Sequence, residues 1–469
     1  MKKVFLINSN IETLPYPVAP LGISLVASSL LQNYQVKVFD FSFHTTEILI
    51  QAISDYKPDF IGVSLRNVDN VTMRRCRWYL NDIKQQITEP IKKHFTIPLI
   101  IGGSGFSIAP KEILDFFNAD YGVIGEAEQV FPQLLEQIDK KTQYLEIPGV
   151  ISKYNPELRH IKYNNKELHL PKANIDSFIN FDLYKQRGNY PIQTKRGCTH
   201  KCVYCSYPNI EGRVYRLRPV NEIVDEIEGI YKRIPGVTFE FVDSTFNSPL
   251  KHAVNICKEI IRRGLKVSLR TMGVNPGDVT DELIQLMLKA GFAQIDCTPD
   301  SASTKMIKSY RKNFNKNRLI RAAEIIRKNN MPTMWFFMIG GPGETEETIL
   351  ETFEFIDNYI YEEDMVHITE GIRIIPGTEL YTIALQQEVI SSGDSVIEPM
   401  FYVDPLLGKD MLTKILEREI ALRNNVMNSI DTAPSKELMQ AAIQYRKENK
   451  LVEPMFRTLL RIQNQKDIK

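Results

Sequence analysis

Disulfide bonds and membrane-spanning helices are the first features that this sequence does not support. Its 469 residues include only six cysteines, too few for a disulfide framework in a chain of this length. No apolar run approaches the roughly 20 residues that cross a bilayer, and the run at residues 4–7 is too short for a signal-peptide core. We therefore expect a cytoplasmic protein with no membrane partner.

An excess of charge of either sign is also missing. Lys and Arg number 58 against 57 for Asp and Glu, so the formal net charge is +1. This balance gives no overall field that attracts nucleic acid, and the sequence has no recognisable DNA-binding module, internal repeat or low-complexity tract. We therefore expect no nucleic-acid partner, and the length predicts two or three domains.

The first 140 residues alternate short β-branched runs with segments that carry apolar residues at helical spacing. Such alternation is typical of a parallel sheet covered by helices on both faces. The predicted strands are residues 4–8, 36–41, 60–65, 98–103 and 121–126. This rhythm predicts a doubly wound, flavodoxin-like α/β domain at 1–140, with its ligand beyond the carboxyl ends of the strands.

The rest of the chain divides into three parts. Residues 141–189 are polar and aperiodic, which is typical of a connecting segment. Over residues 190–389 six repeats of strand and helix predict a partial (β/α)6 barrel of the TIM type. Its predicted strands are residues 192–195, 238–243, 266–270, 294–298, 334–339 and 366–375. Residues 390–469 are charged and helical in pattern, and they predict a small C-terminal helical region.

Three of the six cysteines crowd into eight residues after the first predicted barrel strand. Cys198, Cys202 and Cys205 are spaced four and then three apart. A loop of this length can direct three thiolates at one iron–sulfur cubane. Because such clusters usually have four cysteine ligands, one iron would be open to a ligand that is not protein. A zinc site completed by His200 is the alternative, although structural zinc sites usually pair their ligands in two separated units.

This spacing resembles the cluster loop of the radical S-adenosylmethionine (SAM) superfamily, in which a Cys-x3-Cys-x2-Cys loop follows the first barrel strand. The resemblance implies that Cys198, Cys202 and Cys205 hold a [4Fe-4S] cluster and that the open iron binds the amino and carboxylate groups of SAM. It also implies that Tyr204, the aromatic residue before the third cysteine, packs near the adenine.

The same resemblance implies further SAM contacts at the carboxyl ends of later strands. They are Asp243 or Ser244 for the methionyl amine, Asp300 and Ser301 for the ribose, and Gly340, Gly341 and Pro342 for the adenine. Other interpretations stay open. Asp300 or Ser301 could cap a helix, and the glycines could form an ordinary turn between a strand and a helix.

The domain at 1–140 resembles the cobalamin-binding module of cobalamin-dependent radical SAM enzymes. The match depends on turns at residues 17–22, 64–70 and 102–107, which hold small residues at the carboxyl ends of predicted strands. Such residues let a large planar ring and its nucleotide tail approach the backbone. The contacts implied are Pro20, Leu21, Gly22, Ser64, Leu65, Arg66, Asn67, Gly102, Gly103, Ser104, Gly125 and Glu126. The turns alone would also suit a flavin or no ligand.

The resemblance leaves the lower face of cobalt without a histidine. The Asp-x-His-x-x-Gly signature of other cobalamin proteins is absent, and no histidine precedes His44. Arg66 could lie under the corrin, or it could be a salt-bridged surface residue. Arg213, Arg216 and Arg218 follow the cluster loop, and they could pair with carboxylates at the domain junction, hold cobalamin or bind an acidic substrate.

Together these resemblances imply a cobalamin-dependent radical SAM methyltransferase. In such enzymes cobalamin takes a methyl group from one SAM, and a second SAM is cleaved at the cluster to a 5'-deoxyadenosyl radical. That radical removes hydrogen from an unactivated carbon, which then captures the methyl group. We expect a small-molecule or peptide substrate and an electron donor such as flavodoxin or ferredoxin. The sequence indicates no catalytic side chain, no particular substrate and no oligomeric state.

Other functions would use the same domains. The same cofactors could run a rearrangement, a cyclisation or a polar C-methylation, and a cobalamin- or cluster-binding sensor would use the same domains without cleaving SAM. Methylthiotransferases share the cysteine triad but have three further cluster cysteines in the N-terminal domain. We reject that assignment because this domain has only Cys76.

Overall fold

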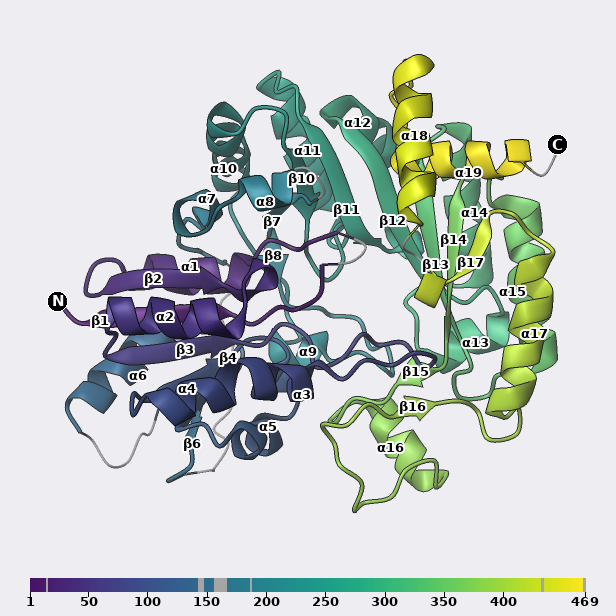
Figure 1. Ribbon diagram of the computed structural model, residues 1–469. Coiled ribbons are helices and arrows are strands. Elements are labelled where there is room, and N and C mark those ends of the chain that lie inside the picture. The colour runs from purple at the N-terminus through teal and green to yellow at the C-terminus, as the bar shows by residue number, and fades with distance from the viewer. Residues whose placement is uncertain (14–15, 142–146, 156–166, 186–187, 432–433, 467–469) are drawn as a thin grey trace.

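The computed structural model describes residues 1–13, 16–141, 147–155, 167–185, 188–431 and 434–466. They form two α/β units, each built on one large sheet, with the N-terminal unit at the left of Figure 1 and the larger unit at the right. This arrangement confirms the predicted α/β class, with a doubly wound domain followed by a partial barrel.

The N-terminal sheet has the strand order β2-β1-β3-β4-β5-β6. Its strands are β1 (Lys3–Asn8), β2 (Gln35–Asp40), β3 (Phe60–Ser64), β4 (Leu99–Gly102), β5 (Tyr121–Val123) and β6 (Val150–Ser152). The first five are parallel, in the flavodoxin-like order. The sixth runs antiparallel to β5 and lies in the segment predicted as a connector, so the sheet extends past residue 140.

Apolar residues on both faces of this sheet explain why helices cover it twice. Along β1, Phe5 and Ile7 face the core formed with α2 to α5, whereas Val4 and Leu6 face the core formed with α1 and α6. The helices are α1 (Leu21–Leu30), α2 (Thr46–Tyr56), α3 (Tyr79–Ile83), α4 (Glu89–His94), α5 (Pro110–Phe117) and α6 (Val130–Asp139). The carboxyl ends of the strands point toward the second unit (Figure 1).

The second unit is a partial barrel of seven parallel strands in the order β17-β14-β13-β12-β11-β10-β7. They are β7 (Tyr190–Ile192), β10 (Thr238–Phe241), β11 (Ser268–Val274), β12 (Phe292–Asp300), β13 (Thr333–Ile339), β14 (Met365–Glu370) and β17 (Val426–Asn428). All six predicted barrel strands are present. The seventh, β17, comes from the region predicted as C-terminal and helical, which therefore also adds a strand to the barrel sheet.

Helices surround this sheet on its outer side (Figure 1). The longer ones are α10 (Val220–Arg233), α11 (Leu250–Arg262), α12 (Asp281–Ala290), α14 (Lys316–Lys328), α15 (Glu346–Tyr359) and α17 (Lys409–Ala421). Short helices in the connections are α7 (Ile175–Phe178), α8 (Asp182–Lys185), α9 (Tyr207–Ile210), α13 (Thr304–Ser309) and α16 (Glu379–Gln386).

Two of the predicted barrel strands are each divided in two. The resulting short ladders pair β8 (Lys195–Arg196) with β9 (Arg216–Leu217) and β15 (Ile372–Arg373) with β16 (Phe401–Tyr402). The second division occurs at Gly371, which has a left-handed φ of 70°. Because a residue with positive φ does not continue a strand, the chain turns there and leaves the barrel.

A loop of the N-terminal unit, residues 65–78 after β3, reaches the barrel. The buried carboxylate of Asp69 accepts from Arg373 of β15 at 2.7 Å, and neither side chain is more than 6% exposed. Arg74 of the same loop pairs with Glu370 at the end of β14. Because both ion pairs join the two units, they restrict how the units dock.

The C-terminal helices α18 (Lys436–Glu448) and α19 (Met455–Lys466) follow β17. Phe456 and Leu460 of α19 pack on Met365, the first residue of β14, so this helix covers the amino end of the barrel. The buried Arg457 pairs with the buried Asp364 at 2.8 Å.

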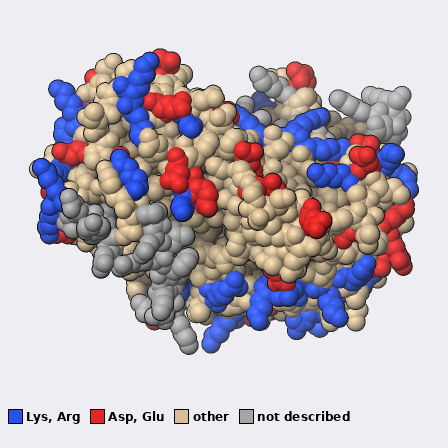
Figure 2. Space-filling model, turned by 90° about the horizontal axis from the view of Figure 1, so that it is seen from below, with Lys and Arg blue, Asp and Glu red and all other residues tan. Residues whose placement is uncertain are grey.

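The surface agrees with the balanced composition. Figure 2 shows basic side chains gathered along the lower edge of one face and acidic ones scattered over it, without a continuous field of one sign. In the part of the chain that the structure describes, none of the helices has the length and apolar character of a membrane span.

Replacing Arg457 by methionine should destabilise the barrel unit. The change leaves the Asp364 carboxylate buried without its partner, a loss that typically costs about 3 kcal/mol. Urea unfolding followed by circular dichroism should give a lower midpoint for Arg457→Met. The exposed Lys447→Met on α18 should unfold like the parent, and equal midpoints for both variants would show that the pair does not hold α19.

Candidate functional site

The cluster loop, residues 197–206, runs between β8 and α9 at the junction of the two units. Cys198 is buried, and Cys202 and Cys205 are partly exposed. The three lie close enough for the charges of Cys198 and Cys202 to act on Cys205. Within the described ranges, however, no three Cys, His, Asp or Glu side chains are gathered as a ready metal-ligand set.

Backbone contacts fix both ends of this loop. Gly197 has a φ of 85°, and a Cβ there would lie 2.1 Å from the carbonyl oxygen of Val214, so only glycine fits. Farther along, the amide of Val203 donates to the carbonyl of Tyr310 at 3.3 Å. The loop is therefore held on the barrel before any ligand binds.

The thiols suit an iron–sulfur cluster chemically. Burial raises the pKa of Cys202 and raises that of Cys205 to about 12, and the nearby ammonium of Lys312 offsets this only in part. Thiolates at these positions therefore need a bound cation, which a cluster supplies. The residues present fit such a group.

Carboxylates of the N-terminal unit hold the hairpin that leads into the cluster loop. Glu128, which follows β5, lies 2.5 Å from Arg196 of β8. Glu126 lies 3.0 Å from Arg196 and also pairs with Arg216 of β9. None of the four side chains is more than 19% exposed. Although burial would raise the pKa of Glu128, Arg196 lowers it overall, so this carboxyl stays ionised. We call these four residues the junction ion network.

The three arginines that follow the cluster loop have different partners. Arg216 pairs with a carboxylate across the domain junction, which was one of the predicted alternatives. Arg218 pairs with Glu226 of α10 at 2.7 Å, and Arg213 donates to Asn209 at 3.3 Å, both within the barrel unit.

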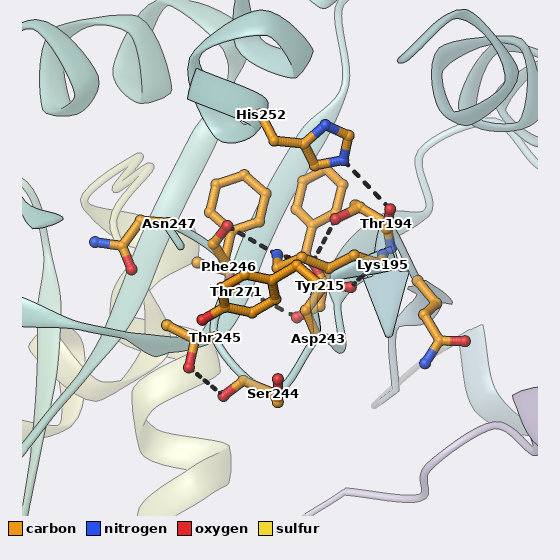
Figure 3. A network of polar contacts seen from close by, with 12 residues as sticks. Thr194, Lys195, Tyr215, Asp243, Ser244, Thr245, Phe246, Asn247, His252 and Thr271 are labelled. Atoms are coloured by element: carbon orange, nitrogen blue, oxygen red, sulfur yellow. Dashed lines mark hydrogen bonds and ion pairs between the residues drawn. The ribbon is translucent and has the colours of Figure 1, made fainter. Parts of the chain in front are cut away.

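A fully buried ion pair joins Lys195 of β8, just before the cluster loop, to Asp243, just after β10 (Figure 3). The ammonium of Lys195 donates to Asp243 at 2.9 Å and to the carbonyl of Phe246 at 3.0 Å. Asp243 also accepts from the amide of Thr194 at 2.7 Å. Because the carboxylate of Asp243 is occupied inside the protein, the partly exposed Ser244 is the more accessible of the two predicted contacts for the methionyl amine.

Asp300 lies in a second charged cluster, beside the cysteines. This residue ends β12 with a left-handed φ of 64°, and its carboxylate pairs with Lys312 and accepts from the hydroxyl of Tyr204. The charge of Lys312 also acts on Cys202 and Cys205. The fold thus brings two predicted SAM contacts to the cluster loop and adds Lys312, for which the sequence carries no signal.

Ser301 does not join this group. Its side chain is buried, and its hydroxyl lies 3.2 Å from that of Thr352 on α15. It therefore faces the helix layer, and its predicted ribose contact stays a prediction.

The glycines predicted to lie against adenine are also needed by the protein's own packing. A Cβ on Gly341 would lie 2.1 Å from the ring of Tyr310, and one on Gly340 would lie 2.9 Å from Leu412 of α17. Pro342 is buried as well. An ordinary tight turn explains the glycines, and the adenine contact stays a prediction.

The turns predicted to contact cobalamin line the carboxyl edge of the N-terminal sheet. Gly103 has a φ of 100°, and a Cβ there would lie 2.4 Å from the carbonyl oxygen of Leu65. The exposed members of the predicted set are Gly22, Arg66, Asn67 and Ser104. Those partly exposed are Leu21, Ser64, Gly102, Gly103, Gly125 and Glu126, and those buried are Pro20 and Leu65. An accessible edge of small residues fits a large flat ligand.

Arg66 is exposed at this edge, and its charge acts on Tyr207 of α9 across the junction. Among the described residues it makes no ion pair, so the salt-bridged alternative is not supported. A position under the corrin stays a prediction.

Two family models match the chain. Residues 7–135 match the B12 binding domain, and residues 192–356 match the Radical SAM superfamily. The chain is 24% identical over 443 residues to a tryptophan 2-C-methyltransferase of Streptomyces laurentii, covering 80% of this chain and 73% of that protein. It is 25% identical over 378 residues to a hopanoid C-3 methylase of Methylococcus capsulatus, covering 77% and 67%.

Solved structures share the whole fold. The radical SAM methyltransferase TsrM from Kitasatospora setae, determined with cobalamin and a [4Fe-4S] cluster bound, superposes with a TM-score of 0.82 at 20% identity, covering 99% of this chain and 100% of that one. The cobalamin-dependent SAM radical enzyme OxsB gives a TM-score of 0.73 at 16% identity, covering 100% and 71%.

The buried carboxyl of Glu344 should make the free energy of unfolding depend on pH. Burial raises the pKa of this carboxyl from 4.5 to about 7, even though Thr348 and the amide of Gly340 donate to it. Between these values the folded protein keeps a proton that the unfolded chain loses. The free energy of unfolding should therefore fall by about 3 kcal/mol as the pH rises from about 4.5 to 7.

Glu344→Gln does not ionise and should lack this part of the pH dependence. Urea titrations at pH 5 and pH 7.5 measure it, and Glu347→Gln, exposed in the first turn of α15, should behave like the parent. If Glu344→Gln keeps the parent's difference between the two pH values, the buried carboxyl is not its source.

Proposed function

Because the chain combines a B12-binding domain with a radical SAM domain, we propose that it is a cobalamin-dependent methyltransferase acting on an unactivated carbon. Its cofactors are a [4Fe-4S] cluster, SAM and cobalamin. Both curated relatives named above are carbon methyltransferases by name, which supports this reaction over a rearrangement or cyclisation.

The junction ion network is the observation that carries this proposal. Glu126 belongs to the predicted cobalamin edge, and Arg196 stands two residues before Cys198. A direct ion pair between them means that the predicted cobalamin edge and the cluster loop meet at one junction. Methyl transfer that uses both cofactors requires such proximity.

The chain's own residues bind and orient the cofactors. When bound, the cofactors supply an electron, a carbon-centred radical and a methyl carrier, which side chains do not provide. Cys198, Cys202 and Cys205 would hold the cluster. Lys312 pairs with Asp300 and would hold its carboxylate in place for the ribose of SAM. The hydroxyl of Tyr204 donates to the same carboxylate from the cluster loop.

Substrate and partners stay less defined. The named relatives act on an amino acid and on a hopanoid, two unrelated compounds, so their names select no substrate for this chain. We keep the expectations of a small-molecule or peptide substrate, a flavodoxin or ferredoxin as electron donor, and a cytoplasmic location.

Product analysis tests the proposal before any substrate is known. Protein reconstituted anaerobically with cluster and reduced cobalamin and then incubated with SAM should form about one equivalent of S-adenosylhomocysteine per bound cobalamin as the methyl group passes to cobalamin. Further reduction should cleave more SAM to 5'-deoxyadenosine. Replacing the three cluster cysteines by alanine should abolish 5'-deoxyadenosine but spare S-adenosylhomocysteine. The exposed Cys76→Ala should keep both products, and 5'-deoxyadenosine without S-adenosylhomocysteine from the parent would refute methyl transfer.

Glu128→Gln tests the shared junction. The change removes one carboxylate from the buried Arg196, which should lower the free energy of unfolding by about 3 kcal/mol. Because the network joins both sites, iron and cobalamin should be lost together on gel filtration. Glu136→Gln, exposed on α6, should retain both, and independent loss of one cofactor from Glu128→Gln would separate the two sites.

A further inference from the structure

Part of the inner face of the barrel is accessible, whereas helices cover its outer face. On β13, Trp335 and Phe337 pack under the helices and are buried. Met334, Phe336 and Met338 alternate with them, point to the opposite side of the sheet and are partly exposed. A fully packed barrel would bury both sets, so the inner face of this sheet is only partly covered.

The lumen is rich in methionine. On β11 the side chain of Met272 is 43% exposed, although its neighbour Thr271 is fully buried. Apolar residues on the inner face include Met272, Met334, Phe336, Met338 and Met427. Methionine adapts its shape to irregular ligands, so this lining suits an apolar body of variable outline.

Charged side chains form one wall of the lumen. Glu240, Arg270 and Asp296 come from the neighbouring strands β10, β11 and β12. Arg270 lies 2.9 Å from Glu240 and 3.4 Å from Asp296. Tyr16, from the loop after β1, donates to Glu240 at 3.1 Å and places its ring 5.2 Å from the guanidinium of Arg270. The N-terminal unit thus reaches into the lumen.

This wall carries more negative than positive charge. Two carboxylates face one guanidinium, and both Glu240 and Asp296 are at least 95% buried. Burial and the charge of Glu240 outweigh Arg270 and raise the pKa of Asp296 to about 6. A positively charged group of a ligand would neutralise the excess negative charge of this wall, because an uncompensated buried charge is costly.

A second, independent feature points to a ligand. His367 lies between Val366 and Ile368, which pack in the outer core, so its imidazole points into the lumen. His367 is only 4% exposed, and its ring stacks on that of Phe336 with the two ring centroids 4.8 Å apart. Among the described residues, neither of its ring nitrogens has a hydrogen-bond partner. Buried polar atoms are rarely left unpaired, so a bound polar group is expected there.

The carboxyl end of the lumen lies on the side of the cluster loop. Its amino end is covered by α19, whose Phe456 and Leu460 pack on Met365. At the other end, β12 finishes at Asp300, which lies beside the cysteine loop. A molecule held in the lumen would therefore extend toward the cofactors.

We propose that Glu240 and Asp296 on the lumen wall recognise a positively charged amine of the substrate, and that this substrate is a small molecule joining the amine to an apolar body. The amine would lie at Glu240 and Asp296, and the apolar body along the methionines. A further polar group of the molecule would satisfy His367. This inference rests on the proposed function, because it treats the lumen as the substrate side of that enzyme.

Binding of three matched probes tests the inference without any turnover. 2-Phenylethylamine, 2-phenylethanol and 3-phenylpropionate share one apolar body and differ in charge. Saturation-transfer NMR on protein loaded with cluster and cobalamin, at pH 8, compares their affinities. The amine should bind at least about tenfold more tightly than the alcohol, and the carboxylate should bind least.

Variants of the two carboxylates test whether they cause the preference for the amine over the alcohol. Asp296→Asn keeps the shape of the side chain and should reduce the amine-to-alcohol ratio by about tenfold, and Glu240→Gln should do the same. The exposed Glu354→Gln on α15 should leave the ratio unchanged. If Glu240→Gln fails to retain cobalamin, Asp296→Asn decides the question alone.

Three results would overturn the inference: no binding of the amine, equal binding of amine and alcohol, or an unchanged preference in Asp296→Asn. Its failure is distinguishable from failure of the proposed function. Selective amine binding by a protein that forms no S-adenosylhomocysteine would support the lumen site and refute methyl transfer. Formation of S-adenosylhomocysteine by a protein that shows no preference for the amine would support methyl transfer and refute the lumen site.

Discussion

The buried ion pairs between Arg196 and Arg216 on one side and Glu126 and Glu128 on the other determine how the two units dock. Charges this deeply placed are costly to separate, since removing one partner of a buried pair typically costs about 3–5 kcal/mol. The two arginines also lie on the hairpin that leads into the cluster loop. Domain docking and the position of the cluster loop therefore depend on the same four side chains.

Other contacts of the N-terminal unit follow from that docking. Asp69 reaches Arg373 at the mouth of the barrel, and Tyr16 reaches Glu240 inside it. The N-terminal unit thus touches the cluster hairpin, the barrel mouth and the lumen wall. In the proposed enzyme this arrangement lets a cobalamin domain and a barrel act on one substrate, because the predicted cobalamin edge and the cluster loop are each placed by charges that the other unit supplies.

Much of this fold could be predicted from the sequence, and the exceptions have physical reasons. The five parallel strands of the first sheet and the six of the barrel have local signals, because β-branched runs alternate with helical spacing. β6 and β17 span only residues 150–152 and 426–428, too few for a periodic signal, and they are strands because a sheet edge is available to them. Gly371 did carry a signal, since a glycine within a strand pattern often marks a bend.

The candidate site was likewise predictable from the sequence only in part. The cysteine triad is a local pattern, so the sequence alone indicated it. The partner of Arg196 lies 68 residues away, and Lys312 meets Asp300 only because α13 folds back, so neither contact has a local signature. The choice between Asp243 and Ser244 likewise needed the fold, which buries Asp243 against Lys195. Glu240, Arg270 and Asp296 were visible as polar residues inside strands, but only the barrel shows that they face one lumen.

Electron paramagnetic resonance measures the shared junction most directly. Protein loaded with both cofactors and reduced anaerobically holds a paramagnetic cluster and cob(II)alamin at the same time. If both lie at this junction, the cobalt signal should broaden or split and should relax faster than in protein loaded with cobalamin alone. A spectrum equal to the sum of the two singly loaded forms would contradict a common site.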